Sequence, residues 1–311
     1  MPLISICIPA YKRVHYLQRL LDSITIQTFK DFEVIITDDS PDDSVEKLII
    51  PYIKKFSILY HHNPQAKGTP ANWNEGIAMA GGEWIKLIHD DDWFAQPSSL
   101  AIFAEHTKKC KKFIFAAYAN RASVNVAGEV KRLQPSWKHR IIKEPMTLLA
   151  YNVVGPPSVT LIHKSIKEKY DEQMKWRVDM DFYVRLLLQE QEYTYIDEVL
   201  IYVGISETQV TSYCFQNPSV ELPEGYLLLK KYGANRLQNI WVYDAWWRLL
   251  RNMNIRTPKQ LLQYEANTWP VAITTLLLHL KRIPSCMLKA GIFSKTAMAV
   301  SYLLNQSKSS R

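Results

Sequence analysis

The sequence predicts an α/β fold in which a mainly parallel central sheet carries helices on both faces, followed by a helical C-terminal extension. Short apolar runs alternate with amphipathic segments along the first 90 residues, which favours parallel strands joined by crossover helices. Several runs also end in Pro or Asp, residues that mark the end of a buried strand. Strands are expected at 4–8, 32–37, 58–60 and 84–88, and helices at 16–24, 44–55 and 74–80.

Each element has its own local signal. Pro9 closes the first apolar run, and Leu17, Leu20, Leu21 and Ile24 then place apolar side chains on one helical face. The second run ends in an acidic pair followed by Ser and Pro. The third run is short, and the helix after it is stopped by two consecutive glycines before the fourth run begins. The order β-α-β-α-β-α-β follows from these signals.

The fourth run ends in three consecutive carboxylates, Asp90, Asp91 and Asp92. Three like charges at one strand end repel one another, so their expected use is to hold a divalent cation or a hydroxyl-rich ligand. A solvated acidic turn is the alternative, and it is the commoner explanation of an isolated Asp-Asp-Asp string. The residues at the ends of the upstream strands favour the ligand site over the solvated turn.

Polar segments follow three of the predicted strands: 9–13, 38–40 and 90–92. In open parallel sheets, ligands bind in the crevice beyond the carboxyl ends of the strands. One rim of the sheet would therefore collect an aromatic side chain, a basic side chain and both acidic clusters. A structural role alone gives no reason for this convergence.

The first 210 residues resemble the inverting family 2 glycosyltransferases of GT-A fold, of the type that builds bacterial surface polysaccharides such as O-antigen or capsule. Each matching segment is short, but their order and spacing together are specific. The matching segments are 4–13, 27–40, 72–85 and 90–92. The resemblance implies a hexosyltransferase that takes its sugar from a nucleotide donor, with a UDP-sugar as the first expectation.

The resemblance also implies site residues. Asp38 would accept hydrogen bonds from the base ring with Asp39 nearby, although Asp and Ser also favour helix caps, so a capping turn is the alternative. Asp90 and Asp92 would take the places of the DxD carboxylates, with Asp92 binding Mn²⁺ or Mg²⁺. Such a hard cation suits oxygen ligands and would stabilise the departing diphosphate. The implied donor-binding residues are Pro9, Ala10, Tyr11, Arg13, Asp38, Asp39, Asn74, Asp90 and Asp91.

A general base is implied by the segment 174–186, which resembles the acidic acceptor-site motif at a helix start. Asp179 is assigned as the base, and Val178 stands where relatives usually carry Glu. Inversion by single displacement needs this carboxylate opposite the departing diphosphate, within reach of the acceptor hydroxyl. The alternative for Asp179 is a charge favoured by the helix dipole. Asp181 and Arg185 are expected to orient the helix or to form a surface ion pair.

Some positions depart from the family pattern. Gly204 and Ser206 stand where many relatives place Arg and His near the diphosphate, so another group would have to complete the metal shell. Trp73 replaces a common Arg, and Lys67 or Arg13 could supply the missing positive charge.

Composition agrees with one sizeable core and a smaller appended unit, since 47% of the 311 residues are hydrophobic. The four cysteines are scattered, which indicates free thiols rather than disulfides or a zinc site. We expect neither a signal peptide nor a membrane-spanning segment. The expected location is the cytoplasm, peripheral to the inner face of the cell membrane.

The predicted domains are 1–215, which binds the nucleotide-sugar and carries catalysis, and 216–311, which is helical and basic. From Arg256 onward the chain has eight basic residues against Glu265 alone, a net charge of +7 of the total +8. Such a tail suits an anionic membrane where a lipid-linked oligosaccharide acceptor would wait. A homodimer interface and a solvated helical cap are the alternatives. No base-reading motif is present, so no nucleic acid partner is expected.

The expected function is metal-assisted transfer of a sugar to a hydroxyl of a glycan, with an Asp as general base. A sugar-phosphate nucleotidyltransferase is one alternative, but it should carry a Gly-rich phosphate loop near the start, which 9–13 lacks. A non-catalytic nucleotide-sugar or membrane-binding adaptor is the other. It is disfavoured because Asp90, Asp92 and Asp179 are all present.

Overall fold

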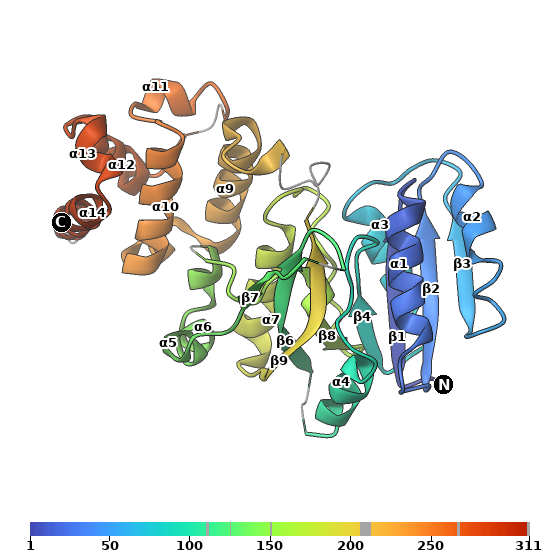
Figure 1. Cartoon of the computed structure of the whole chain (residues 1–311). Coiled ribbons are helices and arrows are strands. Elements are labelled where there is room, and N and C mark those ends of the chain that lie inside the picture. The colour runs from blue at the N-terminus through green and yellow to red at the C-terminus, as the bar shows by residue number, and fades with distance from the viewer. Residues whose placement is uncertain (110–111, 125, 150, 206–212, 266–267, 310–311) are drawn as a thin grey trace. The chain divides into compact units, whose positions relative to one another are not determined.

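The computed structural model describes residues 1–109, 112–124, 126–149, 151–205, 213–265 and 268–309. Ser206 and Cys110 lie outside these ranges. The chain forms two compact units (Figure 1). The first comprises Met1–Pro145, Val153–Gln173 and Phe182–Gln209, and the second comprises Met146–Asn152, Met174–Asp181 and Val210–Arg311. Two short segments that precede residue 216 thus belong with the C-terminal helices, and one of them contains Asp179.

The first unit is built on a nine-stranded sheet in the order β3-β2-β1-β4-β8-β6-β9-β5, with β7 paired to β6. Strands β3, β2, β1 and β4 are parallel to one another, β8 is antiparallel to its neighbours β4 and β6, and β9 is parallel to β6. The mainly parallel sheet predicted from the sequence is therefore confirmed. The strands are β1 Ile4–Ala10, β2 Phe32–Asp38, β3 Ile58–His62, β4 Trp84–Leu87, β5 Trp93–Phe94, β6 Phe113–Arg121, β7 Glu129–Lys131, β8 Thr160–His163 and β9 Thr194–Gly204.

Both faces of the central strands are covered. Consecutive residues of β1, β2 and β4 are buried, which is the pattern of a parallel sheet packed on both sides. Leu17, Leu20, Leu21 and Ile24 of α1 join the core, as the helical spacing predicted. The predicted helix 44–55 is shorter than expected because Pro51 cannot donate to an α-helical ladder. The helices of this part are α1 Val14–Thr25, α2 Ser44–Ile49, α3 Ala71–Met79, α4 Ser99–Thr107, α5 Pro135–Lys138, α6 Arg140–Lys143 and the 3₁₀ turn η2 Pro157–Val159.

The second unit is helical. Trp246, Trp247 and Trp269 are buried in it, so these aromatic side chains contribute to its core. Among the described residues, no helix combines the length and apolar character needed to cross a bilayer. The helices are α9 Pro218–Tyr232, η3 Ala234–Gln238, α10 Ile240–Asn252, α11 Pro258–Leu261, α12 Val271–Lys281, α13 Ser285–Lys289 and α14 Gly291–Ser309.

Two further elements cross the boundary between the units along the chain. The 3₁₀ turn η1 spans Pro145–Leu149, and α7 spans Val178–Glu190. The first residues of α7 belong to the second unit, and the residues from Phe182 onward belong to the first. The predicted acceptor-site motif therefore lies at a helix start, as the sequence indicated.

Candidate active site

The three consecutive carboxylates follow β4 at the carboxyl end of the sheet. They are not a solvated turn: Asp90, Asp91 and Asp92 are 2%, 6% and 2% exposed. Burial of carboxylates without compensation is costly, so their charges need partners. The contacts of this acidic segment are supplied by elements that are distant in sequence.

Arg13 is the cationic partner of the acidic segment. It lies between β1 and α1, and its guanidinium forms ion pairs with Asp90 and, at 3.1 Å, with Asp91. Its Nε also donates to Asp90 at 3.2 Å. The sequence predicted Arg13 as a donor-binding residue, and the structure places it directly against two of the predicted carboxylates.

Asp92 is held from the other side of the segment. The backbone N–H of Gly204, the last residue of β9, donates to its carboxylate at 2.9 Å. Burial, reinforced by Asp91, raises the pKa of Asp92 above its ordinary value. Burial also raises the pKa of Asp90 to about 7, although Arg13 acts in the opposite direction. Both groups would be stabilised as carboxylates by added positive charge.

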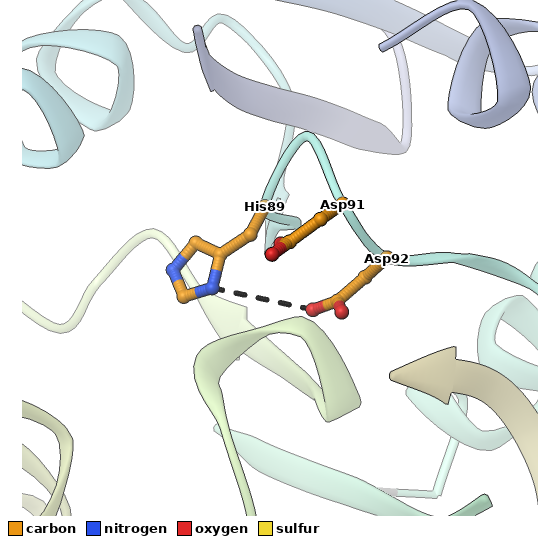
Figure 2. Close-up of side chains that lie close together, drawn as sticks. All are labelled: His89, Asp91 and Asp92. Atoms are coloured by element: carbon orange, nitrogen blue, oxygen red, sulfur yellow. Dashed lines mark ion pairs between the residues drawn. The ribbon is translucent and has the colours of Figure 1, made fainter. Parts of the chain in front are cut away.

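His89 completes a cluster that the sequence did not predict. His89, Asp91 and Asp92 offer ligand atoms that all lie within 4.8 Å of one another (Figure 2). The Nδ1 atom of His89 is 4.0 Å from a carboxylate oxygen of Asp92. Burial lowers the pKa of the imidazole below its ordinary value. The available signal was adjacency, because His89 directly precedes the three acids in the sequence.

The main chain of the acidic segment is fixed by two further residues. Arg19 of α1 donates to the Asp91 carbonyl oxygen at 2.5 Å, and its guanidinium stacks 3.6 Å from the centre of the Trp93 ring. Gly204 approaches the same carbonyl so closely that a Cβ there would lie 2.2 Å from the oxygen. Position 204 thus requires glycine for a geometric reason.

We expect Gly204→Ala to shift the acidic segment and to destabilise the protein by about 1–3 kcal/mol, as overpacking does. The loss should be seen as a lower midpoint in thermal unfolding. Gly291→Ala is the matched control, because a Cβ at position 291 meets nothing within 4 Å. Equal midpoints for the two variants would contradict the close approach at Gly204.

The predicted base-binding residues have protein partners. Asp38 is fully buried, and its carboxylate accepts from the Ser40 backbone N–H and the Tyr60 hydroxyl, both at 2.8 Å. The Asp39 carboxylate accepts from Asn63 Nδ2 and from the Gly68 N–H, also at 2.8 Å. The bond from the Ser40 N–H to Asp38 forms a local turn, but this turn caps no helix, because α2 begins at Ser44 with Asp43 as its N-cap residue.

The other predicted donor-side residues differ in surroundings. Tyr11 is half-exposed just beyond β1, whereas Ala10 is buried. Pro9 lies in β1 and is partly buried. Asn74 binds the main chain of Tyr170 in both directions, at 2.9 Å each.

Two further donor-side positions departed from the family pattern in the sequence. The ring of Trp73 packs 4.7 Å from that of His89, centre to centre. The amine of Lys67 forms an ion pair with Glu75, so its charge is already engaged.

Asp179 lies in the first turn of α7, within the second unit. Its carboxylate accepts from Asn152 Nδ2 at 2.6 Å and from the Met180 N–H at 2.7 Å. Burial raises the pKa of Asp179 to about 7, against the effect of these hydrogen bonds. Neighbouring Asp181 is fully buried and paired with Lys231, which supports the expectation that it orients the helix. A common cleft for Asp179 and Asp92 stays a prediction, since they belong to different units.

The family profile described as Glycosyl transferase family 2 matches residues 5–163, just over half of the chain. The chain belongs to glycosyltransferase family 2. The match begins in β1 and extends to the end of β8, so it includes the acidic segment and the edge of the sheet on which it lies. The resemblance seen in the sequence is thereby confirmed, and the protein is a glycosyltransferase.

Some relatives of this family 2 glycosyltransferase are named for polysaccharide synthesis. The chain is 29% identical over 218 residues to WcaA of Escherichia coli K12, named as a colanic acid biosynthesis glycosyl transferase. The match covers 68% of this chain and 76% of the relative. This chain is also 25% identical over 192 residues to the chondroitin synthase of Pasteurella multocida. That match covers 60% of this chain and 19% of the chondroitin synthase.

Solved structures confirm the GT-A fold of this glycosyltransferase. S. aureus TarS 1–349 in complex with UDP-GlcNAc aligns with a TM-score of 0.58 at 16% identity, covering 99% of this chain and 92% of that one. The mannosyltransferase PcManGT of Pyrobaculum calidifontis, in complex with GDP-Man and Mn²⁺, aligns with a TM-score of 0.58 at 9% identity. That match covers 98% of this chain and 87% of the other. At such identities the likeness shows the fold.

The donor set of the acidic segment fits a divalent cation in this glycosyltransferase. Two buried carboxylates and one imidazole face the same space (Figure 2), and both kinds of group are ordinary ligands of Mn²⁺. The raised pKa values of Asp90 and Asp92 agree with a site that is short of positive charge. Arg13 supplies part of that positive charge, and a bound cation would supply the rest.

Proposed function

We propose that this enzyme transfers a sugar, with inversion, from a nucleotide-diphosphate sugar to a hydroxyl of a lipid-linked glycan. The single observation that carries the proposal is the placement of Asp179, a partly buried carboxylate in the first turn of α7 that is held by Asn152 and the Met180 N–H. Burial raises its pKa to about 7. A base is most effective when its pKa lies near the working pH.

On the donor side, the proposal assigns nucleotide binding to the carboxyl ends of β1, β2 and β4. Tyr11 is exposed beyond β1 and offers an aromatic face to a base or ribose, and Arg13 adds a cation beside the acids. Asp38 and Asp39 fix the shape of the neighbouring loops through their hydrogen bonds. A UDP-sugar is the first donor to test, and the UDP-GlcNAc complex of TarS supports that order.

Asp92, with Asp91 beside it, would hold Mn²⁺ or Mg²⁺. Bound there, the cation would neutralise charge that grows on the leaving diphosphate as the glycosidic bond breaks. Arg13 orients Asp90 and Asp91, and the Gly204 N–H orients Asp92. The protein thus fixes the acids before the donor arrives.

On the acceptor side, the Asp179 carboxylate would take the proton of the acceptor hydroxyl while its oxygen attacks the anomeric carbon. The bond from that carbon to the diphosphate breaks in the same step, so the configuration inverts. Asn152 and the Met180 N–H fix the orientation of the carboxylate. Burial keeps it basic enough to accept a proton near neutral pH.

A panel of nucleotide-sugars, tested by thermal shift with and without Mn²⁺, would identify the donor. We expect one nucleotide class to raise the unfolding midpoint, and to raise it further when Mn²⁺ is present. The anomeric configuration of the product, determined by NMR, then tests inversion. A retained configuration would exclude the single-displacement mechanism. Stabilisation by none of the donors would exclude the proposed substrate class.

The orientation of α14 supports a membrane-facing C-terminal region. Its buried face is mainly polar: Ser294 bonds Trp247, Ser301 bonds Tyr243, and Asn305 reaches a main-chain carbonyl. Its exposed side carries several large apolar residues, which is unusual for a surface helix. The exposed side of α14 includes Ile292, Val300 and Leu303, exposed by 88%, 52% and 65%, beside the exposed polar residues Lys295 and Thr296.

Lys295 is exposed on the same helix, and the region is strongly basic, so anionic lipid is the occupant that we propose. The buried Trp residues take no part in this contact.

We expect Ile292→Glu/Leu303→Glu to reduce co-sedimentation with phosphatidylglycerol vesicles by about tenfold or more, since two apolar contacts are lost and two like charges are added. Both residues are exposed, so the unfolding midpoint should stay unchanged. Ile26→Glu/Ile53→Glu is the matched control, because these residues are similarly exposed in the first unit. Unchanged sedimentation of the α14 variant, or a change from dimer to monomer in light scattering, would contradict membrane contact.

A further inference from the structure

We propose that His89 is a nitrogen ligand of the divalent cation, and that it makes this glycosyltransferase prefer Mn²⁺ over Mg²⁺. The inference rests on the proposed metal-assisted function and adds a ligand that the family resemblance does not supply. Its basis is the juxtaposition of the His89 ring with Asp91 and Asp92 at the end of β4 (Figure 2).

The position of the His89 ring is fixed by its neighbours. His89 lies one residue before the acidic segment, and its backbone N–H is fixed by the Ser158 hydroxyl at 3.0 Å. Its ring packs against Trp73, which limits the orientations that it can adopt. Nδ1 faces Asp92 at 4.0 Å, a separation too long for a hydrogen bond and short enough for two ligands of one ion after a small rotation.

The His89 ring has a nitrogen without a hydrogen bond in the part of the chain that the structure describes. Nε2 of His89 is buried and has no hydrogen-bond partner among the described residues. A buried imidazole usually has one nitrogen bonded to a carbonyl, a carboxylate or a metal. Here the groups that face its Nδ1 side are the carboxylates of the acidic segment. The arrangement thus leaves a neutral donor beside two anionic ones.

Mg²⁺ and Mn²⁺ differ in the ligands that they prefer. Mg²⁺ prefers oxygen ligands and gives up its water reluctantly, whereas Mn²⁺ accepts both imidazole and carboxylate. A site with one nitrogen and two carboxylate ligands should therefore discriminate between the two ions. A site made of carboxylates alone would discriminate less. The identity of residue 89 thus becomes a determinant of metal preference.

The test is electron spin-echo envelope modulation spectroscopy of Mn²⁺ bound to the full-length protein, measured in one sample with UDP and in another with GDP. We expect modulation from a directly bound ¹⁴N, and we expect it to change when the protein is labelled with ¹⁵N-histidine. His89→Ala should remove the signal and weaken Mn²⁺ binding about tenfold or more, while Mg²⁺ binding changes less. His139→Ala, which changes an exposed histidine, is the control. It should retain both the nitrogen signal and the wild-type affinity for Mn²⁺.

His89→Asp replaces the nitrogen by oxygen and should lower the ratio of Mn²⁺ to Mg²⁺ affinity about tenfold. The wild-type spectrum decides the question even if a variant folds poorly. Bound Mn²⁺ without histidine nitrogen modulation would overturn the inference and leave the metal-assisted mechanism standing. Failure of Mn²⁺ to bind with either nucleotide would overturn both.

Discussion

Replacing Asp179 by Asn should lower kcat by about 10²–10⁴-fold while nucleotide binding stays unchanged, because the variant loses the proton acceptor and keeps the shape. Asn can still accept a hydrogen bond from the Met180 N–H, so the start of α7 should be preserved, while the bond from Asn152 Nδ2 is lost. Initial rates with the identified donor and acceptor measure the first effect, and calorimetric titration with UDP measures the second.

Two comparisons make the experiment specific. Asp181→Asn changes a carboxylate two residues away that is fully buried and paired with Lys231, so it should reduce stability more than turnover per folded molecule. Asp179→Glu keeps the charge and moves it, so partial activity is expected. Turnover of Asp179→Asn at the wild-type level would remove Asp179 from the mechanism.

The pH dependence follows from the same carboxylate. Burial raises the pKa of Asp179 to about 7, so the free enzyme should lose the base form as the pH falls through this value. The acidic limb of kcat/KM should therefore lie near pH 7 rather than near pH 4. Asn152→Ala removes a bond that favours the charged form, so this limb should move to higher pH. A limb that does not move would argue against Asp179 as its origin.

Stability should change in the opposite sense to activity. The pKa of Asp179 is higher in the folded than in the unfolded state, so its ionisation costs stability as the pH rises from about 4 through about 7. Above this window, Asp179→Asn should unfold at a higher temperature than the wild type. Below pH 4 the wild-type carboxyl group is neutral in both the folded and the unfolded state, so this contribution of its ionisation should vanish.

The elements that could be predicted from the sequence are those with local signals. The apolar runs gave β1 to β4, and the positions of the polar segments after them gave the edge of the sheet where Arg13 and Asp90 meet. This succeeded because the carboxyl ends of parallel strands share one edge, a rule that needs no knowledge of side-chain packing.

The contacts that set the state of the site were not predictable in this way. Gly204 reaches Asp92 across more than a hundred residues of sequence, through the antiparallel pairing of β9 with β5, the strand that directly follows Asp92. Register between strands so distant in sequence is decided by tertiary packing and leaves no local pattern. For the same reason, the bonds between Asn74 and the main chain of Tyr170 could not be predicted, and the place of Asn74 at the donor stays a prediction. His89 was overlooked because a single histidine matches no metal-binding spacing motif, although it directly precedes the three acids.

Replacing Asp92 by Asn should weaken Mn²⁺-dependent nucleotide binding by about 10–100-fold and leave metal-independent binding unchanged. Asn retains an acceptor for the Gly204 N–H, so the change is mainly one of charge. Burial makes the Asp92 carboxylate costly when no cation balances it, since its pKa is raised. The variant should therefore gain stability at alkaline pH while it loses metal affinity.

Asp91→Asn and Asp90→Asn separate the roles within the acidic segment. Asp91 lies in the cluster with His89, whereas Asp90 is tied to Arg13 by two hydrogen bonds. Titration of Mn²⁺ in the presence of UDP or GDP should therefore show a large loss for Asp92→Asn, a loss for Asp91→Asn and a smaller one for Asp90→Asn. A normal affinity in Asp92→Asn with a complete loss in Asp91→Asn would transfer the principal metal contact to Asp91. Asp92 would then be the residue that fastens β9 to the acidic segment through Gly204.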